Sequence, residues 1–226
     1  MLLAAALWSP ETFASFTLGL DQEFSGGTPP VSSSRPWVTA TFHDNGDGTV
    51  NFILSTPHLG ASENVSEFYF NFDDHLDVNR LSFSVASASG TFTVPSISKG
   101  VDKGRNPLRA GSSGKYDVRI NFATGGPPKT FGVGDQLVLK ISYTSSIDSS
   151  AFGYLSDAAG GHGPFYAAAH VQNTGTRGGD SGWISPRVIT PLITPVPEPS
   201  TIIAGALLLL PFGANAIRLL RKHRVA

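Results

Sequence analysis

Trp37-Val-Thr-Ala-Thr-Phe42 and Thr49-Val-Asn-Phe-Ile-Leu54 stand on either side of Asp44-Asn-Gly-Asp-Gly48, and this stretch decides the fold class. In both flanking runs apolar residues alternate with polar ones, which is the pattern of a β-strand that buries one face. The Asn-Gly and Asp-Gly pairs between them adopt positive φ at little cost, as tight hairpin turns require. The stretch therefore predicts two antiparallel strands joined by a turn.

Comparable runs recur along the chain and are separated by Gly, Pro, Asn and Asp, which favour turns. They lie at residues 67–72, 81–85, 116–122, 136–143, 165–171 and 183–184. Roughly eight or nine strands with no helical pattern between them indicate two packed sheets. The expected fold is therefore all-β, a two-sheet antiparallel β-sandwich of jelly-roll type over residues 15–188. Residues 95–114 and 153–163 are expected to form long surface loops, where binding sites often lie.

Composition narrows the range of functions. The chain has 226 residues, of which 40% are apolar and 15% charged, and this suits one β domain with processing segments at its ends. It has no cysteine, which excludes disulfides, thiolate zinc sites and thiol nucleophiles. The net charge is −1, and four basic residues lie within the last thirty, so the rest of the chain is more acidic. An acidic body argues against nucleic acid as a partner.

The last thirty residues have the order of a membrane-inserting signal. A Pro-rich linker at 189–196 leads into the motif at 197–199, an apolar segment follows at 201–217, and a basic tail covers 218–226. A helix over 201–217 would be about 25 Å long, near the minimum for crossing a bilayer. By the positive-inside rule the tail stays in the cytoplasm and the body faces outward. The membrane-stop cluster consists of Arg218, Arg221, Lys222 and Arg224.

This C-terminal region resembles the PEP-CTERM sorting signal, with Pro197, Glu198 and Pro199 as its motif. The resemblance implies that an exosortase, a membrane-embedded cysteine protease of Gram-negative bacteria that make extracellular polysaccharide, recognises the motif and removes the tail. The two prolines keep the motif extended and open to a protease. The alternative is a permanently membrane-anchored envelope protein that keeps its tail.

Residues 1–14 are expected to be the remnant of a secretory signal peptide, with an apolar run and a cleavage site at Thr12-Phe-Ala14. The body also resembles an uncharacterised type of PEP-CTERM protein. The matching stretches lie at 36–42 with 48–50, at 65–73, and at 169–172 with 181–184. This resemblance implies a fold and a location at the cell surface or in the extracellular matrix, and it implies no activity.

Acidic residues offer the first candidates for chemistry. Asp73 and Asp74, with Asp77 nearby, suit an Asx turn at the end of a strand, and the alternatives are a calcium site or an acid and base pair. The turn is the preferred interpretation, because the spacing matches no ligand motif. Asp44-Asn-Gly-Asp-Gly48 lacks the third acidic position and the final glutamate of a calcium loop. We expect neither a metal nor another cofactor.

Histidines and serines provide no catalytic motif. The six histidines, at 43, 58, 75, 162, 170 and 223, form no HExxH pattern. His170 lies in an apolar run and is expected in the core with a backbone hydrogen bond, whereas His162, in a Gly-rich loop, is the better functional candidate. Gly178-Gly-Asp-Ser-Gly182 contains the nucleophile sequence of serine proteases, but the chain lacks the companion contexts, so a turn is expected.

Aromatic residues leave two interpretations open. Packing between the sheets is the default, and stacking on sugar rings is the alternative if several aromatic rings share an exposed face. The residues concerned are Trp37, Tyr69, Tyr143, Tyr154, Tyr166 and Trp183. The overall prediction is an exported, exosortase-sorted surface or matrix protein with a structural or polysaccharide-binding β-sandwich, and not an enzyme. A carbohydrate-active hydrolase is the alternative, and it would need two carboxylates in a cleft about 5–10 Å apart.

Overall fold

The computed structural model describes residues 14–125 and 129–187. They belong to one compact unit, Ala14–Thr194, and a second unit comprises Met1–Phe13 with Pro195–Ala226. Three expected segments lie outside the described residues: the signal remnant at 1–14 except Ala14, the linker at 189–196, and the sorting signal at 197–226. Within 14–125 and 129–187, no helix has the length and apolar character needed to cross a bilayer.

The prediction of an all-β fold is confirmed, because strands dominate the described residues and helix among them is confined to short turns. The strands are β1 (Ser15–Glu23), β2 (Val38–Asp44), β3 (Val50–Ser55), β4 (Asn64–Phe70), β5 (Ser82–Ser89), β6 (Val101–Ala110), β7 (Ser113–Asn121), β8 (Phe131–Gly132), β9 (Gln136–Ser142), β10 (Ala167–Thr174) and β11 (Asp180–Pro186). The helical turns are η1 (Val78–Arg80), α1 (Ile97–Gly100) and η2 (Ser149–Phe152).

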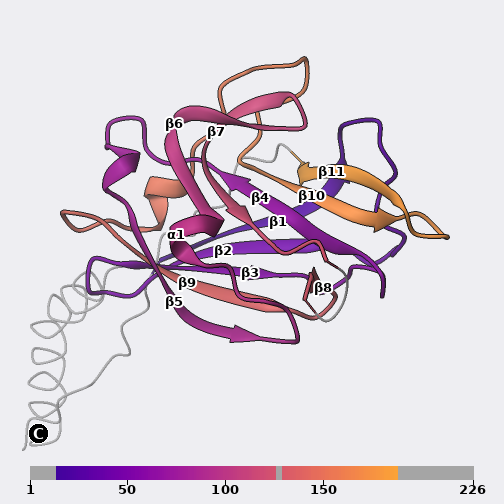
Figure 1. The fold of residues 1–226 in the computed structure, drawn as a ribbon. Coiled ribbons are helices and arrows are strands. Elements are labelled where there is room, and N and C mark those ends of the chain that lie inside the picture. Colours follow the sequence, from indigo (N-terminus) through magenta and orange to yellow (C-terminus); the bar gives the residue numbers. More distant parts are fainter. Residues whose placement is uncertain (1–13, 126–128, 188–226) are drawn as a thin grey trace, which may run out of the picture. The chain divides into compact units, whose positions relative to one another are not determined.

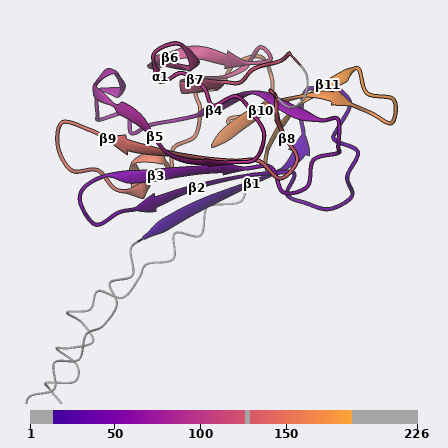
Figure 2. The same cartoon turned by 60° about the horizontal axis from the view of Figure 1, so that its bottom comes forward.

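All strands belong to one antiparallel sheet in the order β5-β9-β3-β2-β1-β11-β10-β4-β7-β6, with β8 paired to β4 off this path. The sheet curls so that the half from β5 to β1 lies beneath the half from β11 to β6 (Figures 1 and 2). The two expected layers are thus the halves of one sheet, because β1 pairs with β2 on one side and with β11 on the other. The β1–β11 pairing is irregular between Leu20 and Gln22, where the sheet turns from one layer to the other.

The hairpin predicted over residues 37–54 is confirmed. β2 and β3 pair from Thr39 opposite Ser55 to Asp44 opposite Val50. Gly46 and Gly48 in the turn have φ of 76° and 78°, values that favour glycine. The backbone N–H of Thr49 donates to Asp47 Oδ1 over 3.0 Å, which closes the turn from within.

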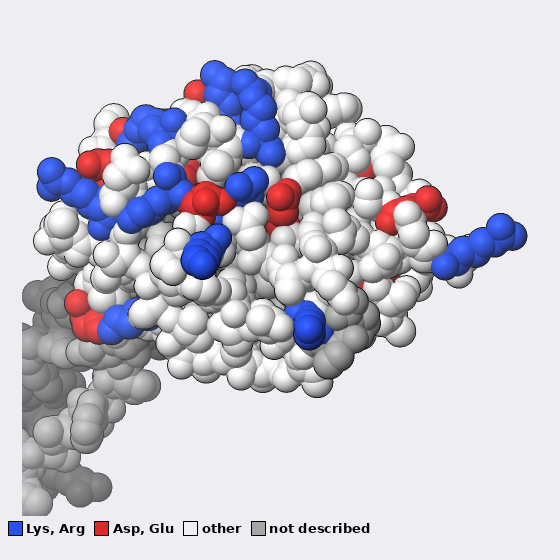
Figure 3. Space-filling view, viewed as in Figure 1, with Lys and Arg blue, Asp and Glu red and all other residues white. Residues whose placement is uncertain are grey.

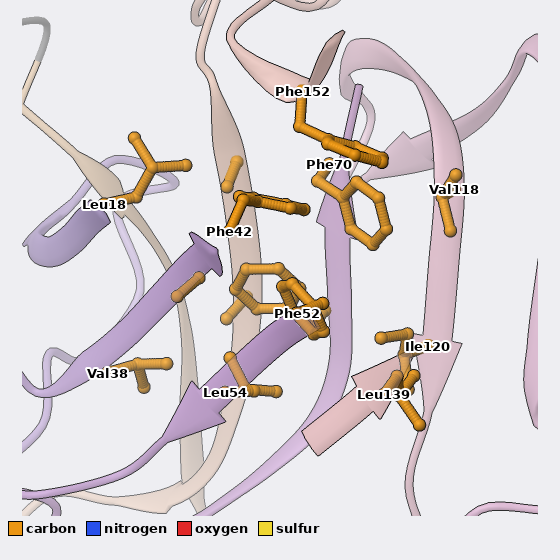
Figure 4. Close-up of a cluster of buried hydrophobic side chains, with 14 of the residues drawn as sticks. Leu18, Val38, Phe42, Phe52, Leu54, Phe70, Val118, Ile120, Leu139 and Phe152 are labelled. Carbon is orange, nitrogen blue, oxygen red and sulfur yellow. The ribbon is translucent and has the colours of Figure 1, made fainter. Parts of the chain in front are cut away.

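The core lies between the two halves and is rich in phenylalanine (Figure 4). Phe42 on β2 stacks on Phe152 of η2 with ring centroids 4.5 Å apart, and it contacts Phe70 of β4 at 5.3 Å. Phe52 on β3 lies 5.2 Å from Phe70. These rings come from both halves and are fully buried, so their packing holds the curled sheet closed.

Two segments differ from the expectation. β1 was not predicted as a strand, although Phe16, Leu18 and Leu20 alternate along it with more exposed residues. Residues 95–114 were expected to be a loop and instead contain α1 and β6. The polar sequence of β6, which includes Gly104 and Pro107, carries no strand signal, and pairing with β7 imposes the strand despite two register shifts. The predicted loop at 153–163 is confirmed, since it contains only isolated bridges.

Candidate functional site

Strand register brings four side chains into one line on the outer face of the upper half-sheet. His170 of β10 lies opposite Trp183 of β11 and opposite Glu67 of β4. Glu67 in turn lies opposite Asn121 of β7. Neighbours such as Phe68 and Ile184 point the other way and are buried in the core, as the alternation of a strand requires. Residues from four strands therefore share one surface.

This line of side chains lies in a hollow of about 400 Å³. Six of the eight lining residues lie on strands, so the pairing of the sheet holds most of the lining side chains in place. The hollow is lined by Ser66, Glu67, Asn121, Phe122, Thr124, His170, Gln172 and Trp183.

One wall of the hollow is aromatic. The rings of His170 and Trp183 stack with centroids 4.6 Å apart and an interplanar angle of 15°. Tyr69 packs at 5.7 Å from Trp183 beneath them. Gly111 leaves room for the indole, since a Cβ there would stand 2.5 Å from Trp183 Nε1. Ser66 Oγ lies 2.9 Å from His170 Nδ1 and orients the imidazole.

The other wall is polar, with Glu67 and Asn121, and both residues belong to a network behind it that connects three strands. Arg119 of β7 donates through Nε and Nη2 to Asp102 Oδ2 of β6, at 2.9 and 2.7 Å. Its Nη1 lies 3.7 Å from Glu67 Oε1 of β4. Asn121 Nδ2 also donates to Asp102 Oδ2 over 2.9 Å, and Tyr69 Oη donates to Glu67 Oε2 over 2.9 Å. The network holds the polar side chains in fixed orientations.

The environment sets the charge of these groups. Burial lowers the pKa of His170, against the opposing effect of Glu67, so its imidazole is neutral at neutral pH. Burial acts to raise the pKa of Asp102, but the hydrogen bonds from Arg119 and Asn121 outweigh it and hold that pKa below its ordinary value. Burial also raises the pKa of Tyr69 to about 12, which keeps its hydroxyl a hydrogen-bond donor. The aromatic wall of the hollow is therefore uncharged at neutral pH, and the Asp102 carboxylate, which accepts from Asn121, is ionised.

The predicted roles of the histidines are wrong in part. His170 was expected in the core with a backbone partner, and it is half-buried on the outer face beside a serine hydroxyl. His162 is exposed in its loop, 6.1 Å from the ring of Phe24, and does not line the hollow. Trp37 follows the core expectation, because it is fully buried and its Nε1 donates to the Ser32 carbonyl over 2.8 Å.

The acidic cluster after β4 forms turns. Asp73 Oδ1 accepts from the backbone N–H of His75 over 2.8 Å, which is an Asx turn. Asp77 caps η1 by accepting from the backbone N–H of Asn79 over 3.1 Å. Asp74 forms an ion pair with Arg105. In the part of the chain that the structure describes, no group of three or more acidic or histidine side chains is arranged to hold a metal ion.

The Gly178–Gly182 segment comprises the last two residues of the β10–β11 turn and the first three residues of β11. Gly178 and Gly179 have positive φ, and Asp180 Oδ2 accepts from the Thr28 hydroxyl over 3.3 Å. Ser181 is paired with Gln172 in the ladder. Both side chains of the Asp-Ser pair therefore serve the turn and the strand that follows it.

From the sequence, Trp183 was one of six aromatic residues considered for sugar stacking, His170 was expected in the core, and the polar wall was missed. Glu67 and Asn121 occupy outward positions of strands that were predicted, so the period-two pattern marked them as surface residues only. Asp102 lies on β6, which was expected to be a loop, so no local signal connected it to Arg119.

Comparison of the chain with protein-family models, with curated proteins and with solved structures finds no match. The sorting motif Pro197, Glu198 and Pro199 and the basic cluster of the tail lie outside the described residues. Function is therefore argued from the sequence of the tail and from the geometry of the hollow.

Proposed function

We propose that this chain is an exported protein that an exosortase sorts to the cell surface or extracellular matrix, where its β domain binds polysaccharide. The order of the motif at 197–199, the apolar segment at 201–217 and the basic tail supports the sorting step. In this proposal the exosortase and the inner membrane are transient partners. Cleavage leaves the β domain as the working part of the protein.

The stacked pair of His170 and Trp183 beside the polar wall is the observation that carries the binding proposal. A sugar ring has an apolar C–H face, which packs on aromatic planes, and a rim of hydroxyl groups, which need hydrogen-bond partners. The hollow offers both, since Glu67, Asn121 and Gln172 lie beside the aromatic wall. A carboxylate and two amides can accept from and donate to sugar hydroxyls.

We further propose that the curled sheet belongs to the jelly-roll type of sandwich, as the sequence suggested. The support is the face-to-face packing of its two halves through Phe42, Phe52 and Phe70. Jelly-roll sandwiches include lectin domains, and this analogy concerns the fold alone. The proposal of sugar binding rests on the residues that line the hollow.

Asp102, the carboxylate bonded to Asn121 beside the hollow, does not have the properties of a hydrolase acid. A glycoside hydrolase needs one carboxylic acid that can protonate the leaving oxygen, and its pKa is raised for this purpose. Asp102 has a lowered pKa and is ion-paired to Arg119 over 2.7 Å, so it is ionised at neutral pH. A reducing-end assay on extracellular polysaccharides, with the wild-type chain and Glu67→Gln, tests the hydrolase alternative.

The sorting step is tested by C-terminal mass spectrometry of the protein released from an exosortase-containing host. We expect a C-terminus upstream of residue 201 and, for a Glu198→Ala variant, retention of the tail in the membrane fraction. Recovery of released protein with an intact Arg218–Ala226 segment would contradict sorting and favour the permanently anchored alternative.

The binding step is tested by retention of the full chain, in mild detergent, on an array of extracellular polysaccharides. Trp183→Ala should weaken retention about two- to tenfold, because stacking contributes about 0.5–1.5 kcal/mol, whereas Trp183→Phe keeps a ring and most of the affinity. Gln172→Ala should weaken it as well. Gln136→Ala on β9 is the matched control, since this exposed glutamine lies on the other half of the sheet.

Two results would contradict polysaccharide binding through the hollow. One is equal retention of the wild type and Trp183→Ala. The other is no retention of the wild type on any polysaccharide, which would leave a structural role as the better proposal.

A further inference from the structure

The curled sheet ends in two edge strands, β5 and β6. An edge strand exposes backbone N–H and C=O groups that can pair with another strand, and proteins protect such edges with charges, prolines or bulges. The two edges of this sheet differ sharply in this respect, and the difference indicates which of them is open to a partner.

The β6 edge is protected. Its sequence contains the charged residues Asp102, Lys103, Arg105 and Arg109. Pro107 lacks a backbone N–H, and the pairing with β7 shifts register twice along the strand. Figure 3 shows basic and acidic side chains interleaved on this part of the surface. An incoming strand would meet charges, a missing donor and an irregular backbone.

The β5 edge has no charge and no proline. Its sequence is Ser-Phe-Ser-Val-Ala-Ser-Ala-Ser, and every residue except the half-buried Phe83 is exposed. Val85 exposes 43% of its surface. The rim of the molecule where β5 lies is mostly white in Figure 3. One register shift, between Val85 and Ser87, is the only irregularity in its pairing with β9.

We propose that β5 is a self-association edge, which pairs antiparallel with β5 of a second copy of this chain. A two-fold axis through the strand sets the same sequence against itself, so any charge on the strand would tend to face its own copy. β5 has no charged residue, and its small Ser and Ala side chains let the two sheets approach closely. The same operation on β6 would bring its basic residues together and would leave the position opposite Pro107 without a donor.

The two-fold axis cannot lie at the beginning of β5. Lys103 Nζ donates to the carbonyl oxygens of Asn79, over 2.7 Å, and of Leu81, and therefore places a cation beside the start of the strand. The two-fold axis is accordingly expected beyond Phe83, within 84–89. Pairing of so few residues buries little surface, so association should be weak in dilute solution and should rise with concentration, as at a crowded surface.

The experiment uses the absence of native cysteine. Single-cysteine variants of the full chain at each position from 84 to 89 are oxidised in mild detergent, and disulfide-linked dimer is measured. Residues at the axis have Cα atoms about 4.5–5.5 Å apart, within disulfide range. One step along the strand offsets the equivalent Cα atoms by roughly 7 Å along the strand, so they lie about 8–9 Å apart and outside that range. We expect one sharp maximum within 84–89. Arg109→Cys on β6 is the control and should not cross-link.

In a second set, each single-cysteine variant also carries Ser84→Lys. The variant with its cysteine at position 84 carries Ser87→Lys instead. Both serines are exposed, so the substitution should leave the fold intact, which thermal unfolding checks. Lysines placed along the paired edge should reduce cross-linking about tenfold or more, because edge charges oppose strand pairing and like charges brought into one interface cost several kcal/mol. Equal cross-linking at all positions, cross-linking of Arg109→Cys as strong as at the maximum, no effect of the added lysine, or no cross-linked dimer at any concentration would each overturn the proposal.

Discussion

The pKa of His170 lies below its ordinary value because its ring is half-buried, stacked on the indole of Trp183. A protonated ring would lose hydration without gaining a close partner, since the attraction of Glu67 only partly offsets the burial. At the scale of single residues, the aromatic wall of the hollow therefore depends on a histidine that remains uncharged.

The free energy of unfolding should decrease on acidification in a step that belongs to His170. Its folded pKa lies below the ordinary 6.5, so the unfolded state binds more protons between the two values. The contribution is complete above about pH 6.5 and is lost as the pH falls through the folded pKa. Urea unfolding at a series of pH values measures the step.

Two features identify the residue responsible for this step. His170→Gln should flatten the pH dependence just below 6.5, whatever its effect on absolute stability. Asp47, with its pKa lowered to about 2, contributes only at more acidic pH, since its ordinary value is 3.8. Wild-type and variant curves of the same shape above pH 5 would be inconsistent with this account.

At the scale of elements, Arg119 connects three strands. It donates two hydrogen bonds to Asp102 of β6, and its third nitrogen lies 3.7 Å from Glu67 of β4. The planar guanidinium can serve both partners at once, which the single ammonium of lysine cannot. This connection matters because β6 pairs with β7 through an irregular ladder.

Arg119→Lys should therefore destabilise the protein by about 0.5–1.5 kcal/mol, the usual range for a lost hydrogen bond. Arg187→Lys is the matched control, because the Arg187 ion pair with Asp21 is longer, 3.4 Å, and 59% of the arginine side chain is exposed. Exposed pairs contribute about 0–1 kcal/mol, so this control should change little. Denaturant unfolding compares the two, and an equal loss in both would refute the bridging role.

At the scale of the whole molecule, the curled shape depends on phenylalanine packing between the two halves of one sheet. Phe42 contacts rings from β3, β4 and η2, and none of its surface is exposed. Because both halves contribute rings, loss of this contact affects the closure of the sheet as well as the local strand.

Phe42→Ala should destabilise the protein by about 3–5 kcal/mol, since it removes a buried ring and leaves a cavity in a packed core. Phe83→Ala on edge strand β5 makes the same chemical change at a half-buried position and should cost clearly less. Guanidinium unfolding measures both values. A similar loss in the two variants would mean that the core between the halves is not the main source of stability.

Most strands were predictable because alternation is a local property of the chain. Residues 37–54 predicted β2, β3 and their turn, and the register of the hairpin agrees. β6 was not predictable, since a strand that contains Gly104 and Pro107 carries no local signal and exists only because β7 offers a partner. A role of Trp183 in sugar stacking was one of two interpretations of its residue type and stays a prediction, whereas the role of Asp102 and Arg119 depends on their contact in the fold.

The sequence by itself determined that the chain folds into β-strands, that it contains no cysteine chemistry, and that its last thirty residues match the order of a sorting signal. Tertiary structure alone decided that the strands form one curled sheet, that β5 and β6 are its edges, and that Trp183, His170, Glu67 and Asn121 form one line. The reason is physical. Alternation and turn residues act over a few neighbours, but strand order and register are set by which distant segments bury their apolar faces together.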